Sequence, residues 1–414
     1  MKLCLALLAA TGAFASPYPP RPRTEKLAPV TREGSTLLVG GKPWKAVGPN
    51  IYWLGLDENV IPPEGQPFYE PTKASYPTKE RITEAMAMVQ ALGGTMIRAH
   101  TLGVSTGNPL SVMPEPGIVN EDAFETIDWA VYQAAQYGIR LLVPLVDNYG
   151  NSELTHRQDY YHGGKYNFLR WAGLDLTMAR DSNDPQIQQF YTNATVVDAF
   201  KGYVRTLLTH RNRHNNLTYA EDPAIFAYES GNELTGPVPG DMGCPAGWVR
   251  EVARFVKGLA PGKLFFDGTY GVNPAHLDIE EVDVFSDHFY PVNTTKLRAD
   301  VQAVAGAGKA YYAGEFGWLG GGGSLESFFD MIESSATVCG DSFWSLFGHN
   351  APDCSTFVDH NDGFTLQYGN PANTADTDSR IRLIRKHFLA MSQNVTISPD
   401  ETLPVVPCPA PTSP

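Results

Sequence analysis

Short apolar runs alternate along this chain with segments of helical periodicity. The runs are rich in Val, Ile, Tyr and Phe and end at small or polar residues, which is typical of buried strands in a parallel sheet. The expected strands are residues 46–52, 95–99, 140–146, 224–229, 263–268, 282–288, 310–315 and 342–347. Helical segments lie between them, so the pattern predicts a succession of βα units.

The helical segments have recognisable ends. Apolar residues recur at helical spacing in segments 78–91, 120–137, 187–210, 248–259, 325–335 and 378–391. Thr78 supplies an N-cap for the first of these, and Gly138 stops the second. Eight strands with helices between them are the count of a (β/α)8 TIM barrel, so we expect an α/β protein built as one barrel domain with long βα loops.

Both ends of the chain differ in composition from the barrel pattern. Lys2 precedes an apolar run over residues 3–10, and Ala13-Phe14-Ala15 has the small-x-small form of a cleavage site. The expected limits are a signal peptide at 1–15, an extended segment rich in Pro, Arg and Thr at 16–35, the barrel domain at 36–397 and a Pro-rich tail at 398–414. The tail is too short to form a second domain.

Cysteines and glycosylation motifs agree with a secreted, extracellular protein. Four cysteines remain beyond the expected signal peptide, enough for two disulfides in an oxidising compartment: Cys244, Cys339, Cys354 and Cys408. The sequence leaves all three pairings open. Asn-x-Ser/Thr acceptors occur at Asn193, Asn216, Asn293 and Asn394. No Cys-x-x-Cys spacing occurs and the histidines lack ligand spacing, so the pattern predicts no metal site.

The charge of the chain narrows its partners. Its 414 residues carry a formal net charge of −14, with 43% hydrophobic and 11% aromatic residues. Such a negative protein is a poor partner for nucleic acid, anionic membranes or a polyanionic substrate. A neutral polymer remains compatible, and we expect a monomer.

Two glutamates stand at the ends of predicted strands. Glu233 follows the run 224–229 in Ser-Gly-Asn-Glu, and Glu315 ends the run 310–315 in Gly-Glu-Phe-Gly. Barrel enzymes place their chemistry at the carboxyl ends of strands, and glycoside hydrolysis needs two carboxylates there. Ordinary ion pairs are the competing explanation for each glutamate alone. Glu229 is expected to be a buried structural carboxylate, although it competes with Glu233 for the acid role.

Other residues at strand ends could support this chemistry. Arg98 presents a fork that could keep Glu315 ionised, and the Tyr290 hydroxyl could hold the same carboxylate. His288 could orient a partner, and Asn232 could bind a sugar hydroxyl beside the reacting carbon. Aromatic rings can stack on the apolar face of a sugar; the candidates are Trp344, Trp53, Tyr52, Tyr149, Trp171 and Trp318. Core packing is the alternative for each of these rings.

The segments that follow carry a resemblance to a known family. They are Gly48-Pro49-Asn50-Ile51-Tyr52-Trp53-Leu54, Ile97-Arg98, Phe190-Tyr191-Thr192-Asn193-Ala194-Thr195, Asp222-Pro223-Ala224-Ile225-Phe226-Ala227-Tyr228-Glu229, Asn232-Glu233, His288-Phe289-Tyr290, Gly314-Glu315-Phe316-Gly317 and Trp344. In this order they resemble glycoside hydrolase family 5, and within it the fungal endo-β-1,4-mannanases. The resemblance implies a (β/α)8 barrel and retaining double displacement without a cofactor. Glu233 would be the acid/base and Glu315 the nucleophile, with Arg98, Asn232, His288, Tyr290 and Trp344 in support.

The chain departs from these mannanases within the expected cleft. The resemblance leads us to expect proline after the acid/base, tryptophan two residues after Arg98 and a tryptophan-containing loop after the third strand. Here the chain has Leu234, His100 and Asp147-Asn148-Tyr149-Gly150 at these places. His100 is therefore a further candidate for contact with substrate. The departures leave open another β-glycan, such as a β-1,4-glucan, exo-acting cleavage, or a barrel that binds glycan without cleaving it.

Overall fold

Eight parallel strands form the centre of the molecule. The computed structural model describes residues 27–150, 161–177, 179, 184–234, 243–319, 321–398 and 400–409. The strands are β4 (Ala46–Pro49), β7 (Met96–Arg98), β8 (Arg140–Pro144), β9 (Ile225–Glu229), β10 (Leu264–Asp267), β11 (Val284–Phe289), β12 (Ala310–Gly317) and β13 (Val338–Trp344). They pair in chain order, and β13 returns to β4. Between β4 and β7, Ile51 N donates to Arg98 O at 3.0 Å, which closes the ring and confirms the expected barrel.

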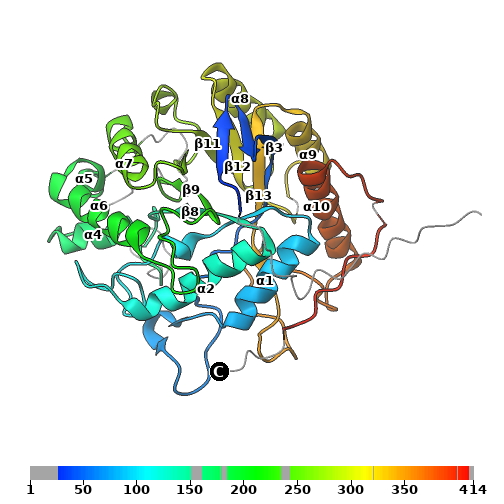
Figure 1. The fold of residues 1–414 in the computed structure, drawn as a ribbon, viewed down its shortest axis with the longest axis horizontal. Coiled ribbons are helices and arrows are strands. Elements are labelled where there is room, and N and C mark those ends of the chain that lie inside the picture. The colour runs from blue at the N-terminus through cyan, green and yellow to red at the C-terminus, as the bar shows by residue number, and fades with distance from the viewer. Residues whose placement is uncertain are drawn as a thin grey trace, which may run out of the picture.

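Helices surround this ring (Figure 1). They are α1 (Lys79–Ala91), α2 (Glu121–Tyr137), α4 (Lys165–Trp171), α5 (Pro185–Thr192), α6 (Ala194–Thr209), α7 (Ala246–Leu259), α8 (Thr294–Gly306), α9 (Leu325–Ser334) and α10 (Ala375–Gln393). The predicted ends of α1 and α2 are confirmed. Thr78 accepts a hydrogen bond from the backbone of Arg81, and Gly138 closes α2 with φ 73°.

The segment predicted as one helix over 187–210 is two helices, so that prediction was wrong. Asn193 has extended backbone angles, and its side chain accepts from Thr195 N as the N-cap of α6. An N-cap needs non-helical backbone, so the first helix ends where the second begins. The sequence also gave no separate prediction for α4 or α8. In α8 only Leu297 and Val304 are buried, too few to produce a clear apolar stripe.

A small antiparallel sheet covers the amino-terminal end of the barrel. Its strands are β1 (Val30–Glu33), β2 (Thr36–Val39) and β3 (Lys42–Trp44). Val30 and Leu37 pack with Phe226 and other inward-facing barrel residues, and the Trp44 ring meets Phe226 edge-on at 5.3 Å. The expected boundary at residue 36 divides this sheet between β1 and β2, which pair directly. The folded unit therefore includes Val30–Glu33.

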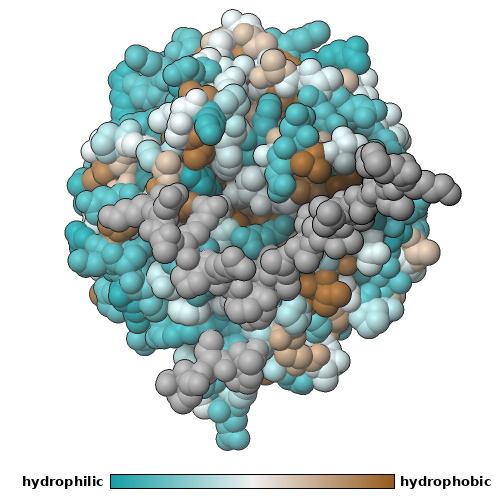
Figure 2. Space-filling view, turned by 45° about the vertical axis from the view of Figure 1, so that its right-hand side comes forward, coloured by the Kyte–Doolittle hydropathy of each residue, from teal (hydrophilic) through white to brown (hydrophobic). Residues whose placement is uncertain are grey.

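The long connections carry short elements of their own. They are η1 (Glu70–Thr72), η2 (His100–Leu102) and η3 (Pro274–His276), with the pairs β5 (Phe68–Tyr69) and β6 (Ala74–Ser75), and β14 (Leu346–Phe347) and β15 (Leu366–Gln367). Within the described residues, no helix is long and apolar enough to cross a membrane. The face in Figure 2 is largely hydrophilic, with hydrophobic residues in small separate patches.

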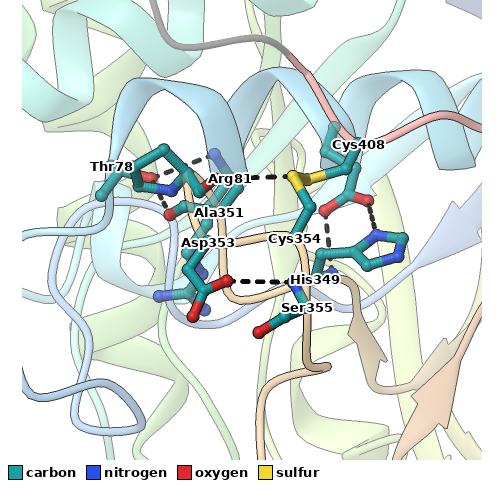
Figure 3. The surroundings of a disulfide bond; sticks show 10 residues. Thr78, Arg81, His349, Ala351, Asp353, Cys354, Ser355 and Cys408 are labelled. Atoms are coloured by element: carbon teal, nitrogen blue, oxygen red, sulfur yellow. Dashed lines mark hydrogen bonds and ion pairs between the residues drawn. A yellow bond between two sulfur atoms is a disulfide. The ribbon is translucent and has the colours of Figure 1, made fainter.

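One of the two possible disulfides is formed. Cys354, in the connection between β13 and α10, is joined to Cys408 in the C-terminal tail (Figure 3). Cys244 and Cys339 are buried and free, so they do not make the second bridge. The expected signal peptide at residues 1–15 lies outside the described residues, as do residues 410–414 of the tail.

The buried imidazole of His387 predicts a pH-dependent stability. Its Nε2 lies 2.9 Å from the Asp341 carboxylate and its Nδ1 2.7 Å from Glu333. Burial alone would lower the pKa of His387, but the two carboxylates outweigh burial and raise that pKa to about 9. The unfolded value is about 6.5. The contribution of His387 to the free energy of unfolding is therefore complete below pH 6.5 and is lost as pH rises through 9. We expect about 2–3 kcal/mol less stability at pH 9.5 than at pH 6.5 from this group.

Urea unfolding at the two pH values, with His387→Gln as the matched variant, measures this loss. The glutamine variant should be less stable at pH 6.5 and should show a flatter pH dependence. Parallel curves for the two proteins would contradict the prediction.

Candidate active site

A cleft opens at the carboxyl ends of the barrel strands. Its volume is about 870 Å³, and side chains from several βα connections line it. The lining residues are Tyr52, Glu58, His100, Asp147, Tyr149, Tyr161, His162, Asn232, Glu233, Tyr270, Tyr290, Glu315, Trp344, His360, Asp362 and Phe364. Most of the residues predicted from sequence to bind or react are therefore brought to one cavity, although they come from distant parts of the chain.

The two predicted catalytic glutamates face each other across His288. His288 pairs in register with Glu315, directly after a register shift that leaves Gly314 of β12 without a partner in β11. Its Nδ1 lies 2.6 Å from Oε1 of Glu233 and 3.4 Å from Oε2 of Glu315. One carboxylate oxygen of each glutamate lies within 4.8 Å of the other. Glu233 has φ 50°, a left-handed conformation that a non-glycine residue rarely adopts and that is often found at functional sites.

Arg98 lies beneath the two glutamates with no exposed side-chain surface. Its Nε donates to Glu229 at 2.8 Å, and Nη1 donates to Glu315 at 2.7 Å. Nη1 also donates to Asn50 at 3.1 Å, and Nη2 donates to Asn232 at 2.9 Å. Glu229 is fully buried and is not among the residues that line the cleft. This arrangement agrees with the structural role expected for Glu229.

Each carboxylate oxygen at the centre of the cleft has a hydrogen-bond donor. The Tyr290 hydroxyl donates to Oε2 of Glu315 at 2.8 Å, as expected, and Arg98 holds the other oxygen. The Tyr149 hydroxyl donates to Oε2 of Glu233 at 2.5 Å, while His288 holds Oε1. The contact of Tyr149 with Glu233 was not expected from the sequence.

The charges in this cluster act against a protonated Glu233, the form that the expected acid role requires. Burial raises the pKa of Glu315, and Glu233 adds to this effect, although His288 and Arg98 act against it. Burial also favours a neutral Glu233, but the charge and hydrogen bond of His288 prevail and lower its pKa. The pKa of His288 is raised, since both carboxylates outweigh its burial. These pKa shifts favour the charged imidazolium of His288 beside an ionised Glu233.

The aromatic candidates separate into cleft and core residues. Trp344 lines the cleft, stacks on Tyr52 at a ring distance of 5.3 Å, and donates from Nε1 to Asp362 at 2.6 Å. Trp53 does not line the cleft. Its side chain is 1% exposed and donates to the carbonyl of Leu346, so the prediction that it binds substrate was wrong. Trp53 lies in the turn after β4, and its ring packs against Phe347 and the guanidinium of Arg81.

Polar residues on the β8 side of the cleft were largely missed. His100 lines the cleft, as expected, and burial together with the charge of Arg98 lowers its pKa well below the ordinary value. Asp147 and His162 also line the cleft and are almost fully buried. The departure at Asp147-Asn148-Tyr149-Gly150 was the available signal for Asp147. His162 follows within the same long connection and has no local motif that would have identified it.

Two groups of side chains bring possible metal-ligating atoms together among the described residues. One is Glu84, His349 and Cys408, and the sulfur of Cys408 is bound in the disulfide. The other is Glu233, His288 and Glu315, whose facing atoms already pair with one another. Hydrogen bonds and shared protons within the second group explain why its atoms lie close together.

Comparisons with known proteins place this chain in a family. A family described as GH family 5 beta-mannosidase-like matches residues 30–295. Mannan endo-1,4-beta-mannosidase 1 of Arabidopsis thaliana is 29% identical over 292 residues, which are 65% of this chain and 62% of the relative. Mannan endo-1,4-beta-mannosidase 8 of Oryza sativa subsp. japonica is 29% identical over 62% of this chain and 61% of its own length. The chain thus spans about three-fifths of these relatives.

Solved structures support the same fold. The endo-1,4-beta-mannanase from Rhizomucor miehei aligns with a TM-score of 0.66 and 19% identity, covering 88% of this chain and 99% of that chain. The endo-beta-1,4-mannanase from Thermotoga petrophila aligns with a TM-score of 0.64 and 20% identity, covering 86% and 79%. These similarities confirm the barrel.

The burial of Arg98 predicts a large loss of stability on its removal. In Arg98→Met, Glu229 would remain buried without its counter-charge, which costs about 3–5 kcal/mol. Arg98→Lys keeps the charge but loses the fork, so it should lose less. Urea unfolding measures both. Arg254→Met breaks an exposed pair with Glu281 and serves as the control, with an expected loss of at most about 1 kcal/mol. Equal losses for Arg98→Met and Arg254→Met would contradict the prediction.

Proposed function

This chain belongs to the GH family 5 beta-mannosidase-like family, and from this premise we propose that it is a retaining glycoside hydrolase. Its proposed reaction is cleavage of internal β-1,4 linkages in mannan-type polysaccharides. The names of its plant relatives, mannan endo-1,4-beta-mannosidases, support the choice of substrate. The observation that carries the mechanism is the pair Glu233 and Glu315, with carboxylate oxygens within 4.8 Å. Retaining enzymes hold their carboxyl groups about 5–5.5 Å apart, whereas inverting enzymes need about 6.5–9.5 Å.

The proposed first step is formation of a glycosyl-enzyme. A Glu315 oxygen attacks the anomeric carbon as the glycosidic bond breaks, and protonated Glu233 gives its proton to the departing oxygen. The leaving sugar departs as an alcohol, and Glu315 is left as a glycosyl ester. In the second step Glu233, now ionised, takes a proton from water, whose oxygen attacks the anomeric carbon and releases Glu315. Two displacements restore the original configuration.

His288 is the proposed source of the acid proton. The two carboxylates raise the pKa of His288, and its Nδ1 lies 2.6 Å from Oε1 of Glu233. Substrate that enters the cleft excludes water. The loss of water destabilises the charged forms of His288 and Glu233 and favours their neutral forms. The proton would then move from Nδ1 of His288 to Glu233, leaving a neutral imidazole and a neutral acid beside the glycosidic oxygen.

The remaining cleft residues have supporting roles in this proposal. Arg98 and Tyr290 hold both oxygens of Glu315, which fixes the nucleophile for attack. The Asn232 amide, oriented by Arg98, would bind the hydroxyl beside the reacting carbon. Trp344 would stack on a sugar ring, and its indole is fixed by Asp362.

We also propose that the chain acts outside the cell as a monomeric glycoprotein, with the barrel domain as its catalytic unit. The Cys354–Cys408 disulfide supports an oxidising compartment. The acceptors Asn216, Asn293 and Asn394 are exposed, as glycosylation requires. The net charge of −14 supports a neutral glycan as partner over nucleic acid or a membrane surface.

A β-1,4-glucan is a second candidate substrate. His100 stands where the resemblance to mannanases leads us to expect a stacking tryptophan, and it is a neutral, buried polar group. A polar group in place of an aromatic platform changes which sugar hydroxyls the cleft favours.

Glu315→Ala tests the nucleophile. The assay is reducing-sugar release from a panel of glycans: mannan, galactomannan, glucomannan, carboxymethyl cellulose, xylan and β-1,3-glucan. The wild-type protein should be active on the mannans. The variant should lose at least about a thousandfold in kcat, because the covalent step is removed. Near-wild-type turnover of the variant would exclude Glu315 as nucleophile. If the wild-type protein cleaved a different glycan instead, the proposed mechanism would stand and the proposed substrate would be wrong.

Glu233→Gln tests the acid. The variant should lose most activity on polysaccharide but far less glycosylation rate on aryl β-glycosides with activated leaving groups, which need little protonation. Stopped-flow measurement of the aryl alcohol burst isolates this step. Equal losses on both substrates would contradict the assignment of Glu233 as the acid.

A further inference from the structure

The buried carboxyl of Asp147 has one oxygen that the protein holds only at long distance. Asp147 is 2% exposed and lines the cleft three residues beyond β8. Its Oδ1 accepts from the backbone of Tyr149 at 2.9 Å. Its Oδ2 faces Nδ2 of Asn232 at 3.5 Å and Nε2 of His162 at 3.8 Å. The first is a long hydrogen bond and the second is beyond hydrogen-bond distance, so a hydroxyl oxygen placed between the groups would make shorter contacts with Asn232 and Asp147.

The backbone holds Asp147 beside the proposed reaction centre. Asp147 and Asn232 form a parallel bridge, in which Asn232 N donates to Val146 O at 2.7 Å and Asn148 N donates to Asn232 O at 3.0 Å. Arg98 occupies the oxygen of the Asn232 amide, so the Nδ2 group points toward Asp147. The carboxyl therefore has a fixed place next to Glu233.

We propose that Asp147 is a substrate-binding residue whose Oδ2 hydrogen-bonds one sugar hydroxyl, shared with the Asn232 amide. This inference rests on the proposed function. A hydroxyl is both donor and acceptor, so it can accept from Nδ2 of Asn232 and donate to Oδ2 of Asp147. The contact lies on the β8 side of the cleft, where the chain departs from the mannanases it resembles. Asp147 would therefore contribute to the choice of glycan.

The charge state of Asp147 gives the contact a pH dependence. Burial raises the pKa of Asp147 to about 7, and the facing carboxylates of Glu233 and Glu315 add to the increase. The backbone of Tyr149 and the amide of Asn232 act in the opposite direction, and burial keeps His162 neutral by lowering its pKa to about 4. Asp147 is thus neutral at pH 5.5 and ionised at pH 8, where an ionised acceptor binds a hydroxyl more strongly.

Calorimetric binding of β-1,4-mannotetraose, with cellotetraose as a second probe, tests the proposal in a Glu315→Ala background that prevents turnover. Added Asp147→Ala should raise the Kd about tenfold, the effect of one lost hydrogen bond. Asp147→Asn mimics the neutral acid, so the ratio of its Kd to that of the parent should rise from about threefold at pH 5.5 to about tenfold at pH 8. Asp184→Asn, the same substitution at the N-cap of α5, should leave the Kd unchanged.

The possible outcomes distinguish failure of the Asp147 inference from failure of the proposed function. Asp147→Asn retains an oxygen acceptor for the Tyr149 backbone, so its pH-dependent ratio is informative even where Asp147→Ala unfolds. A Kd ratio near one at both pH values would overturn the inference, and a merely structural residue would give a ratio that does not change with pH. A parent protein that binds neither tetrasaccharide would overturn the proposed function and this inference with it.

Discussion

The burial of one guanidinium group is the constraint on which this site depends. Arg98 has no exposed side-chain surface, so its charge and its N–H donors must be satisfied within the protein. The partners come from four places in the barrel: Asn50 after β4, Glu229 in β9, Asn232 after β9 and Glu315 in β12. Only a closed ring brings these positions together. The stability of the barrel and the geometry of the proposed reaction are therefore linked through Arg98.

The cleft above Arg98 is built to share protons. Glu233, His288 and Glu315 lie so close that the charge of each determines the ionisation of the others. These charges favour the imidazolium over a neutral Glu233, although the proposed first step requires a neutral acid. Entry of substrate would change the solvation of all three groups at once. In this proposal, transfer of one proton from His288 to Glu233 prepares the site for the first displacement.

Substrate choice would depend on the connections rather than on the strands. Trp344 is held by Asp362, which lies in the long connection between β13 and α10. Tyr149 reaches Glu233 from the connection after β8. Barrels of one family can therefore keep the same reacting groups while the loops present different rings and polar groups to the glycan. The departures at His100 and Asp147 lie in this variable layer.

The sequence by itself determined the strands and the barrel, because buried strands and capped helices leave local patterns, and it supplied the residues proposed for the site. Arg98, Glu233, Glu315, His288 and Tyr290 stand at strand ends, and parallel strands bring their carboxyl ends to one rim. Tertiary structure alone decided which partner each group has and which rings face the cleft. A buried tryptophan and one that lines the cleft have the same local sequence pattern. The ionisation of a side chain depends on neighbours that are distant in sequence. Contacts between segments far apart in the chain determine these partners and orientations.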